Sequence, residues 1–332
     1  MRKLLTILLL AIIIIGCEKN SHTIVKADKS LSQYSAGDST GTDHSALQNA
    51  INSCENNDTL WLEAGIYFSV PQEFIESLCG NCSEHQTEVN ASTGFVIKDK
   101  AVTIIGRGKD STILISGAGY GVYFENSGRS SLLNLKVTGG KRDVDGAATD
   151  AAVVVRNSKV DITNCALSDN DHRIDSVVVG IGGVFGREGA EIFISNSEII
   201  NNGWDGMALY RGASAVIKDC IIKKGRGAGI GVTWDAHCLA IRNQISEFWK
   251  GIGSFGTSTV MAHNNLVYDN LGWGIIGTGE SYMDATNNVV YHNGNCGVAP
   301  WSQECRGKFV NNIIERLARR MGLSVRRSLE LW

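Results

Sequence analysis

The sequence predicts an all-β solenoid in which three short strands form each coil. Glycines recur every 22 or 23 residues through a stretch from about Gly183 to Ile314, at Gly206, Gly229, Gly251, Gly274 and Gly297. About a dozen residues after each glycine, Asn or Asp precedes apolar residues, as in Asn264-Asn-Leu-Val and Asn287-Asn-Val-Val. Periods of this length indicate a solenoid. Each unit holds three short alternating apolar runs separated by Gly, Asn, Asp and Ser, a pattern typical of strands and turns.

Other repeat architectures fit the sequence poorly. No unit contains a helical apolar stripe, and propeller blades need nearly twice the length. The remaining solution is a coil whose strands stack in parallel on those of the next coil. The repeat length and the Asn-x-x-Ile punctuation resemble the right-handed parallel β-helix proteins of the pectate-lyase-like family, over most of residues 44 to 314. The resemblance implies a right-handed parallel β-helix. It does not fix an activity, because the family includes lyases, glycosidases, epimerases and non-enzymatic adhesins.

The first 17 residues predict export. Arg2 and Lys3 precede an apolar run from Leu4 to Ile15, which is too short for a comfortable membrane span and is typical of a signal peptide. The Ile-Ile-Gly-Cys ending resembles a bacterial lipobox, which implies that Cys17 is lipidated and begins the mature chain. The alternative is an ordinary signal with an incidental cysteine. We expect a lipid-anchored protein of the bacterial cell envelope, periplasmic or on the cell surface, with the membrane as a partner through Cys17.

Three further segments flank or interrupt the repeats. Residues 18–43 are polar and predict a flexible tether. A short amphipathic helix near His44 precedes a strand at Asp58, which resembles the N-terminal cap of pectate-lyase-like β-helices. A cap is expected there, since an open solenoid end exposes core and strand edges. Residues 71 to 94 predict a loop excursion stapled by cysteines. Residues 315–332 form a basic tail, either a capping helix or the truncated end of a longer solenoid.

Charge and cysteine content narrow the class of protein. The net charge is −3 with both signs interspersed, which argues against a nucleic-acid partner, and we expect a monomer. Without Cys17, eight cysteines remain, an even number that favours some disulfides in an exported chain. Cys165 and Cys220 occupy one repeat position two coils apart, which is too far for a bond. We expect both to be small core residues.

Stacking the repeats places aromatic residues on one outer face. The fifth residue from each repeat glycine points outward and gives the column Arg187, Tyr210, Thr233, Phe255, Thr278 and Trp301. The turns around this strand contribute Trp204, Trp234, Trp249 and Trp273. Exposed aromatic side chains at the coil spacing suit the flat faces of sugar rings, and clustered exposed apolar surface marks binding sites. The sequence predicts a polysaccharide-binding face, with Trp204, Tyr210, Trp234, Trp249, Phe255, Trp273 and Trp301 as contacts. The alternative is that these residues cover coil edges.

Charged residues in the first half of the stack form the candidate catalytic group. Arg156, Glu188 and Arg211 are expected to form a column on successive coils, with Arg187 beside it. An insertion from Ser168 to Asp175 would overhang this face. A uronate lyase needs a guanidinium to neutralise the substrate carboxylate and a base to take the C5 proton, whereas a glycosidase needs paired carboxylates. We name as catalytic candidates Asp150, His172, Arg187, Glu188, Asp205 and Arg211, expecting them to meet in one cleft; the alternative is a surface salt-bridge ladder.

The sequence lacks the motifs that would settle the chemistry. The paired-Asp and Gly-His-Gly pattern of polygalacturonases, the Asp-Pro-His of mannuronan epimerases and the Arg-Pro-x-x-Arg of lyases are absent. Calcium would suit Asp- and Asn-rich coils, yet no calcium motif occurs, and the cofactor is left open. Three classes remain: a polysaccharide lyase or hydrolase acting on an acidic glycan, a non-catalytic glycan-binding or adhesive β-helix, and an accessory lipoprotein. The lack of Met/His/Cys clusters argues against metal handling in the third.

Overall fold

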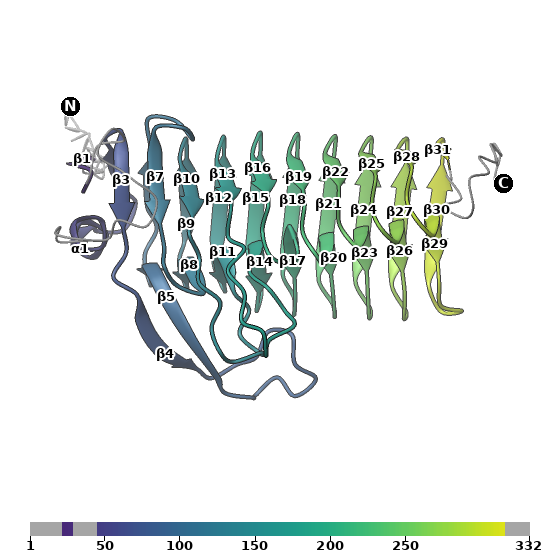
Figure 1. Ribbon diagram of the computed structural model, residues 1–332, viewed down its shortest axis with the longest axis horizontal. Coiled ribbons are helices and arrows are strands. Elements are labelled where there is room, and N and C mark those ends of the chain that lie inside the picture. Colours follow the sequence, from purple (N-terminus) through teal and green to yellow (C-terminus); the bar gives the residue numbers. More distant parts are fainter. Residues whose placement is uncertain (1–21, 29–44, 316–332) are drawn as a thin grey trace, which may run out of the picture.

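The computed structural model describes residues 22–28 and 45–315, and its main feature is three long sheets that run the length of the molecule (Figure 1). From Val102 onward, successive strands along the chain belong to different sheets, so each coil contributes one strand to each sheet. Every pairing between neighbouring coils is parallel. The predicted all-β solenoid with three strands per coil is confirmed.

The first two sheets consist of short strands with clean in–out alternation. Sheet A contains eleven strands: β1 (His22–Val25), β2 (Asp58–Leu62), β6 (Val102–Ile105), β9 (Arg129–Leu133), β12 (Lys159–Thr163), β15 (Glu191–Ser195), β18 (Ser214–Lys218), β21 (His237–Ile241), β24 (Thr259–His263), β27 (Tyr282–Thr286) and β30 (Arg306–Val310). Sheet B contains ten strands: β3 (Gly65–Phe68), β7 (Thr112–Ile115), β10 (Lys136–Thr138), β13 (Ala166–Ser168), β16 (Glu198–Ile200), β19 (Ile221–Lys223), β22 (Gln244–Ser246), β25 (Leu266–Tyr268), β28 (Val289–Tyr291) and β31 (Ile313–Ile314).

Sheet C carries the candidate functional residues. Its ten strands are β4 (Gln72–Glu76), β5 (Val89–Lys98), β8 (Tyr120–Glu125), β11 (Ala151–Arg156), β14 (Gly182–Arg187), β17 (Met207–Leu209), β20 (Ala228–Val232), β23 (Lys250–Ser254), β26 (Trp273–Gly277) and β29 (Cys296–Pro300). The strands β4 and β5 form an antiparallel hairpin, so residues 71–94, predicted as a loop excursion, contain strand on both sides of the loop 77–88. The expected cysteine staple is present as the Cys79–Cys82 disulfide.

Side chains of the same repeat position stack inside the solenoid. Met207 pairs with Ile230, which pairs with Ile252 and then Ile275, and all four are buried, as the repeat predicts. A ladder of buried asparagines runs along a corner between sheets A and B, where each side-chain oxygen accepts hydrogen bonds from the preceding coil: Asn243, Asn265, Asn288 and Asn312. Cys165, Ser197 and Cys220 occupy this position in earlier coils. Cys165 and Cys220 are buried and unbridged, as expected.

The N-terminal end of the solenoid is covered by helix α1 (Ala46–Ser53), which confirms the expected capping helix. Its apolar side chains Leu47 and Ile51 are fully buried against the first coil. One boundary prediction is wrong: residues 22–25, placed in a flexible tether, form β1 and extend sheet A through pairing with β2. Backbone pairing and the burial of Val25 explain the order of this short segment. The signal segment, Cys17 and residues 316–332 lie outside the described residues.

Candidate functional site

Three excursions from the coils form a platform on the outer face of sheet C. They are the β4–β5 hairpin with its connecting loop 77–88, the loop 139–150 before β11, and the loop 169–181 before β14. In Figure 1 they lie together below the N-terminal half of the solenoid. A second apolar cluster, outside the solenoid core, joins this platform to the sheet; its buried members include Cys79, Tyr120, Val154, Phe185 and Tyr210. The platform is therefore a packed part of the fold.

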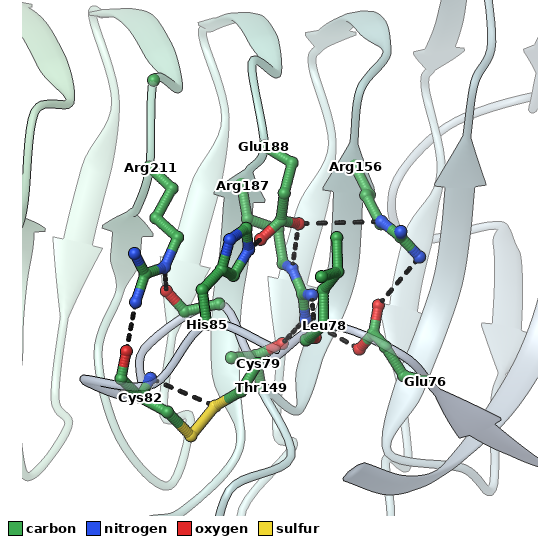
Figure 2. Close-up of polar contacts among 12 residues, drawn as sticks. Glu76, Leu78, Cys79, Cys82, His85, Thr149, Arg156, Arg187, Glu188 and Arg211 are labelled. Carbon is green, nitrogen blue, oxygen red and sulfur yellow. Dashed lines mark hydrogen bonds and ion pairs between the residues drawn. A yellow bond between two sulfur atoms is a disulfide. The ribbon is translucent and has the colours of Figure 1, made fainter. Parts of the chain in front are cut away.

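The centre of the interface between platform and sheet is an ion-paired arginine. Arg187, at the end of β14, exposes 1 % of its side chain and donates from Nη1 to Glu76 Oε2 at 2.7 Å. Its Nε donates to Glu188 Oε2 at 2.5 Å, and its remaining nitrogen donates to the Leu78 carbonyl oxygen (Figure 2). Glu76 also accepts a hydrogen bond from the Tyr120 hydroxyl at 2.5 Å. All three nitrogens of this guanidinium donate to protein groups, and the side chain is buried, so a substrate cannot reach it.

The strand register corrects the predicted charge column. Arg156 stacks on Arg187, not on Glu188, because β11 pairs with β14 one residue earlier than expected. Glu188 instead lies in the turn after β14. Its Oε2 is 3.7 Å from Arg156 Nε, and its Oε1 is 3.0 Å from His85 Nε2. The cluster therefore combines residues of the solenoid with Glu76 and His85 of the hairpin segment.

In three coils, the turn after the sheet C strand holds a non-glycine residue in a left-handed conformation, which indicates that the side chain has a role there. Glu188, Arg211 and Trp234 occupy equivalent turn positions with φ of 47°, 41° and 62°. Later coils place Gly256 and Gly279 there, the residue type that adopts this left-handed conformation most readily. Arg211 uses its position to reach the loop, donating from Nε to the Gly80 carbonyl oxygen at 3.2 Å and from Nη2 to that of Cys82. It also lies 4.5 Å above the Trp234 ring.

Asp150 and His172 lie at the other end of the sheet C strands. Asp150 precedes β11, is fully buried, and pairs with Arg142 Nη1 and with the backbone N–H of Asp143 at 2.7 Å. Burial raises the pKa of Asp150 to about 7, against the opposing charge of Arg142. His172 Nδ1 accepts from the Arg142 backbone N–H at 3.1 Å. These residues tie the loops 139–150 and 169–181 together.

The expected convergence of six catalytic candidates in one cleft is wrong. Arg187, Glu188 and Arg211 meet at the C-terminal ends of the strands under loop 77–88, whereas Asp150 and Asp205 lie at the strand starts. A strand such as β14 spans six residues, so the two groups are separated by roughly 16 Å along the strand. The insertion expected to overhang this face does so, but its polar residues serve the platform itself.

Asp205 is the buried carboxyl candidate that has no ion-pair partner among the described residues. It lies beside Gly231 on the outer face of sheet C, and its Oδ1 accepts from the Ala228 backbone N–H at 2.5 Å. Among the described residues, no cation lies within 4 Å of the Asp205 carboxyl group. The other buried carboxyl groups, Glu76 and Asp150, each form an ion pair with an arginine. Burial raises the pKa of Asp205 to about 7. Burial, followed by the charge of Asp205, raises the pKa of the Tyr210 hydroxyl well above 10.

Lys250 is the cation that acts on Asp205, and Arg226 lies beside Trp204 on the same face. Lys250, at the start of β23, is close enough to oppose the rise in the Asp205 pKa, and its Nζ lies 5.3 Å from the Phe255 ring centre. Arg226 stacks 5.5 Å from the Trp204 ring and donates to the Val178 and Gly203 carbonyl oxygens. Burial lowers the pKa of Arg226, and Arg173 adds to this effect, which shows that a second guanidinium lies nearby. Lys250 is thus close to Asp205, whereas Arg226 and Arg173 are close to each other.

The aromatic residues divide into a buried and an exposed group. All seven lie on the sheet C side, and backbone hydrogen bonds confirm the predicted column from Arg187 to Trp301. Tyr210 is only 5 % exposed, so the prediction that it stands exposed is wrong, whereas Trp204 and Trp234 are half-buried against the platform cluster. Trp249 and Trp301 are 44 % and 66 % exposed, and Trp273 lies between them with ring centres 5.7 and 5.9 Å away. Phe255 lies half-buried across Gly253.

A cavity of about 310 Å³ lies where the platform meets the open face. Its walls come from the disulfide loop, from the 146–149 segment and from sheet C: Cys79, Cys82, Ala147, Phe185, Trp204 and Tyr210 are among the lining residues. The lining carries no ionised side chain.

Within residues 22–28 and 45–315, no three His, Cys, Asp or Glu side chains lie close enough to hold a metal ion. No helix in the same ranges is long and apolar enough to span a bilayer.

Two residues of the charged cluster, Glu76 and His85, escaped sequence analysis because they lie in the irregular segment before the regular repeats. The signal that could have found them was the Cys-Gly-Asn-Cys sequence between them, which indicates an ordered loop.

Comparison with known proteins supports the fold. Residues 182–319 match the family model described as "Right handed beta helix region". The chain is a right-handed parallel β-helix. No curated protein matches it in sequence. The β-helix is similar to the periplasmic alginate epimerase AlgG, with 12 % identity, a TM-score of 0.54 and coverage of 78 % of this chain and 61 % of the epimerase. It thus spans about three fifths of that protein's length.

Two further solved structures show a weaker similarity. Pectate lyase Pel9A is 13 % identical, with a TM-score of 0.48 and coverage of 88 % of the β-helix and 78 % of the lyase. PfbA, a surface adhesin of Streptococcus pneumoniae, is 11 % identical, with a TM-score of 0.42 and coverage of 78 % and 71 %. At such identities the likeness shows the fold alone, and function must be argued from the site.

Proposed function

We propose that this β-helix binds an acidic polysaccharide along the outer face of sheet C and acts on it beside Asp205. The observation that carries the proposal is the run of Trp249, Trp273 and Trp301, which lie on three successive coils with ring centres 5.7 and 5.9 Å apart. Two of these rings are largely exposed. An extended glycan presents flat apolar ring faces along its length, and contiguous exposed apolar surface of this kind marks a binding site.

The charge around the aromatic run supports an acidic ligand. Lys250 and Arg226 flank the point where the run approaches the platform, with Arg173 near Arg226. Uronate carboxylates would pair with these cations.

The chemistry that fits this site is proton abstraction next to a carboxylate. A group with a pKa near 7 is matched to the task of a general base at neutral pH, which suits Asp205. In β-elimination, Asp205 would take the C5 proton, the C4–O bond would break, and the departing oxygen would receive a proton from the Tyr210 hydroxyl. Lys250 would stabilise the negative charge that builds up on the substrate carboxylate. The high pKa of Tyr210 keeps its proton in place for this step.

Hydrolysis fits less well. Glycosidases use two carboxyl groups that face each other across the scissile bond. The other buried carboxyl groups on this side, Glu76 and Asp150, form ion pairs with Arg187 and Arg142, and only Asp150 Oδ1 has no hydrogen-bond partner among these described groups. A non-catalytic glycan-binding or adhesive role is the second candidate, and the exposed tryptophan run favours it because stacking requires no acid or base.

Turnover assays on alginate and polygalacturonate separate these functions. Lyase action releases unsaturated products, which absorb in the ultraviolet, whereas hydrolysis releases reducing ends without that absorbance. We expect Asp205→Asn to abolish turnover while binding persists, and Asp219→Asn, an exposed carboxyl paired with Arg242, to change neither. Binding without turnover, lost on Trp301→Ala, would support the binder instead. Absence of binding to both polymers would refute the glycan proposal.

We also propose lipid anchoring of the chain at the bacterial envelope through Cys17, on the strength of the lipobox-like Ile-Ile-Gly-Cys sequence. Metabolic labelling with palmitate tests this proposal. We expect label on the wild-type protein and none on Cys17→Ser. Equal labelling of both proteins would contradict the assignment.

A further inference from the structure

The outer face of sheet C is closed at one end and open at the other. The platform covers the strands from β8 to β14, where Tyr120, Val154 and Phe185 are buried beneath it. Its farthest contacts along the solenoid are the Cys82 carbonyl with Arg211 and the Val178 carbonyl with Arg226. Beyond these arginines the face from β20 to β29 carries no excursion, as Figure 1 shows. The platform therefore ends in a wall across the face.

The wall is held in place by several independent links. The Cys79–Cys82 disulfide closes the tip of the loop, and Arg187 and Arg211 donate to the carbonyl oxygens of Leu78 and Cys82. On the other side, Arg142 bonds the Val179 carbonyl oxygen at 2.8 Å and pairs with Asp150. These contacts bury charge that would be costly to expose unpaired. A ligand that meets this wall would have to stop at it.

The 310 Å³ cavity lies at the foot of the wall, and Asp205 lies outside its lining but close enough to Tyr210, a lining residue, for its charge to act on that hydroxyl. Asp205 borders Gly231, the first outer-face position beyond the platform, and Tyr210 and Trp204 line the cavity on the platform side. The volume is at the lower end of the range of small-molecule sites, about 300 Å³. Its lining is uncharged and contains three aromatic side chains, Phe185, Trp204 and Tyr210. Such a pocket suits one sugar ring held by its apolar face, with carboxylates left near Arg226 at the edge.

We infer that this β-helix engages the end of its polysaccharide chain and does not bind along the middle. The inference rests on the proposed function and adds to it which part of the polysaccharide chain is bound. The polymer lies over Trp301, Trp273 and Trp249, its last residue enters the cavity, and the linkage presented to Asp205 is close to the chain end. An internal segment of a long polymer would have to continue through the wall, so it cannot occupy the cavity.

Binding stoichiometry tests the inference on the full chain. Alginate and polygalacturonate are each prepared as two pools of tenfold different mean length and titrated at equal uronate mass, with polymer sites counted at saturation. Binding at ends predicts about tenfold more bound protein per uronate mass on the shorter pool. Equal binding per mass on both pools would overturn the inference and leave the proposed function standing. No binding to any pool would refute the proposed function and the inference with it.

A cavity-filling pair of variants provides the structural arm. Ala147→Phe places a ring in the cavity, and Asn81→Trp blocks it from its exposed rim. Thr259→Phe adds the same bulk on the outer face of sheet A and serves as the matched control. We expect each cavity variant to weaken binding of short oligomers at least tenfold, with Thr259→Phe unchanged. Wild-type affinity in Asn81→Trp and Ala147→Phe, with thermal unfolding showing both folded, would overturn the inference.

Discussion

Arg187 and Glu76 form an ion pair of 2.7 Å, although 111 positions separate them in the sequence. The pair joins β14, the fifth strand of sheet C, to the β4–β5 hairpin, which precedes the regular coils. Both side chains are buried, with exposures of 1 % and 0 %. It shows that Arg187, one of the catalytic candidates named from the sequence, joins the platform to the solenoid.

Breaking this pair should destabilise the protein strongly. Arg187→Met leaves the Glu76 carboxylate buried with a reduced set of partners, and such losses cost about 3–5 kcal/mol. We expect the free energy of unfolding in denaturant to fall by that amount. Lys159→Met, which breaks the exposed Lys159–Glu191 pair, should cost less than about 1 kcal/mol. Similar losses for the two variants would mean that the buried pair does not hold the platform.

The asparagine ladder should be sensitive to a single truncation. Asn265 Oδ1 accepts from both the backbone N–H and Nδ2 of Asn243, and its own Nδ2 donates to the Ala240 carbonyl oxygen. Asn265→Ala leaves these buried groups unpaired, at about 1–3 kcal/mol for each unsatisfied group. We expect a drop of about 2–4 kcal/mol in unfolding free energy. Exposed Asn295→Ala should stay within about 0.5 kcal/mol of wild type; a matching loss there would argue against the ladder.

Asp205 should make stability fall as pH rises. Its folded-state pKa is about 7, while an aspartate in the unfolded chain titrates near 4. Between these values the folded state holds more protons, so unfolding becomes easier with increasing pH, by at most about 1.4 kcal/mol per pH unit. Asp205→Asn removes this dependence. The stability advantage of the variant over wild type should therefore grow from pH 5 to pH 7 and level off by pH 8 in urea titrations.

A control carboxyl should behave differently over the same range. The hydrogen bond from Arg242 lowers the pKa of Asp219, so this carboxyl is ionised in both folded and unfolded chains above pH 5. Asp219→Asn should consequently differ from wild type by a constant amount between pH 5 and pH 8. A pH-independent offset for Asp205→Asn as well would contradict the raised pKa.

The tryptophan run should carry the binding free energy. Trp301→Ala and Trp249→Ala remove exposed rings, and a contact of this type contributes more than about 1 kcal/mol, or roughly a fivefold to tenfold change in Kd. Tyr291→Ala is the matched control, because Tyr268 and Tyr291 stack at 5.3 Å on sheet B, away from the proposed face. Calorimetric titration with alginate or polygalacturonate measures both. Weaker binding of Tyr291→Ala alone would move the site to sheet B.

Sequence analysis predicted the architecture because each coil of a solenoid corresponds to one short repeat of the sequence. The glycines at Gly229 and Gly251 and the paired asparagines at Asn264 and Asn287 repeat at the coil length, and each coil contacts mainly its neighbours. The column Arg187, Tyr210 and Phe255 followed by counting residues, and the backbone hydrogen bonds place it as counted. Where an insertion lengthens a coil, counting residues gave a strand register that is wrong by one residue. The structure pairs Arg156 with Arg187, whereas counting had aligned it with Glu188.

The amino-acid sequence by itself therefore determined the coil, its inward columns and the face that gathers the tryptophans, since these depend on a period of fixed length. Only the tertiary structure decided which of those side chains face solvent. The hairpin segment with Glu76 and His85 has no repeat, and its position over Arg187 and Tyr210 follows from long-range ion pairing and apolar packing. That segment pairs Arg187 with Glu76 and Glu188 with His85, whereas Asp205 lies beyond its contacts and has no ion-pair partner among the described residues.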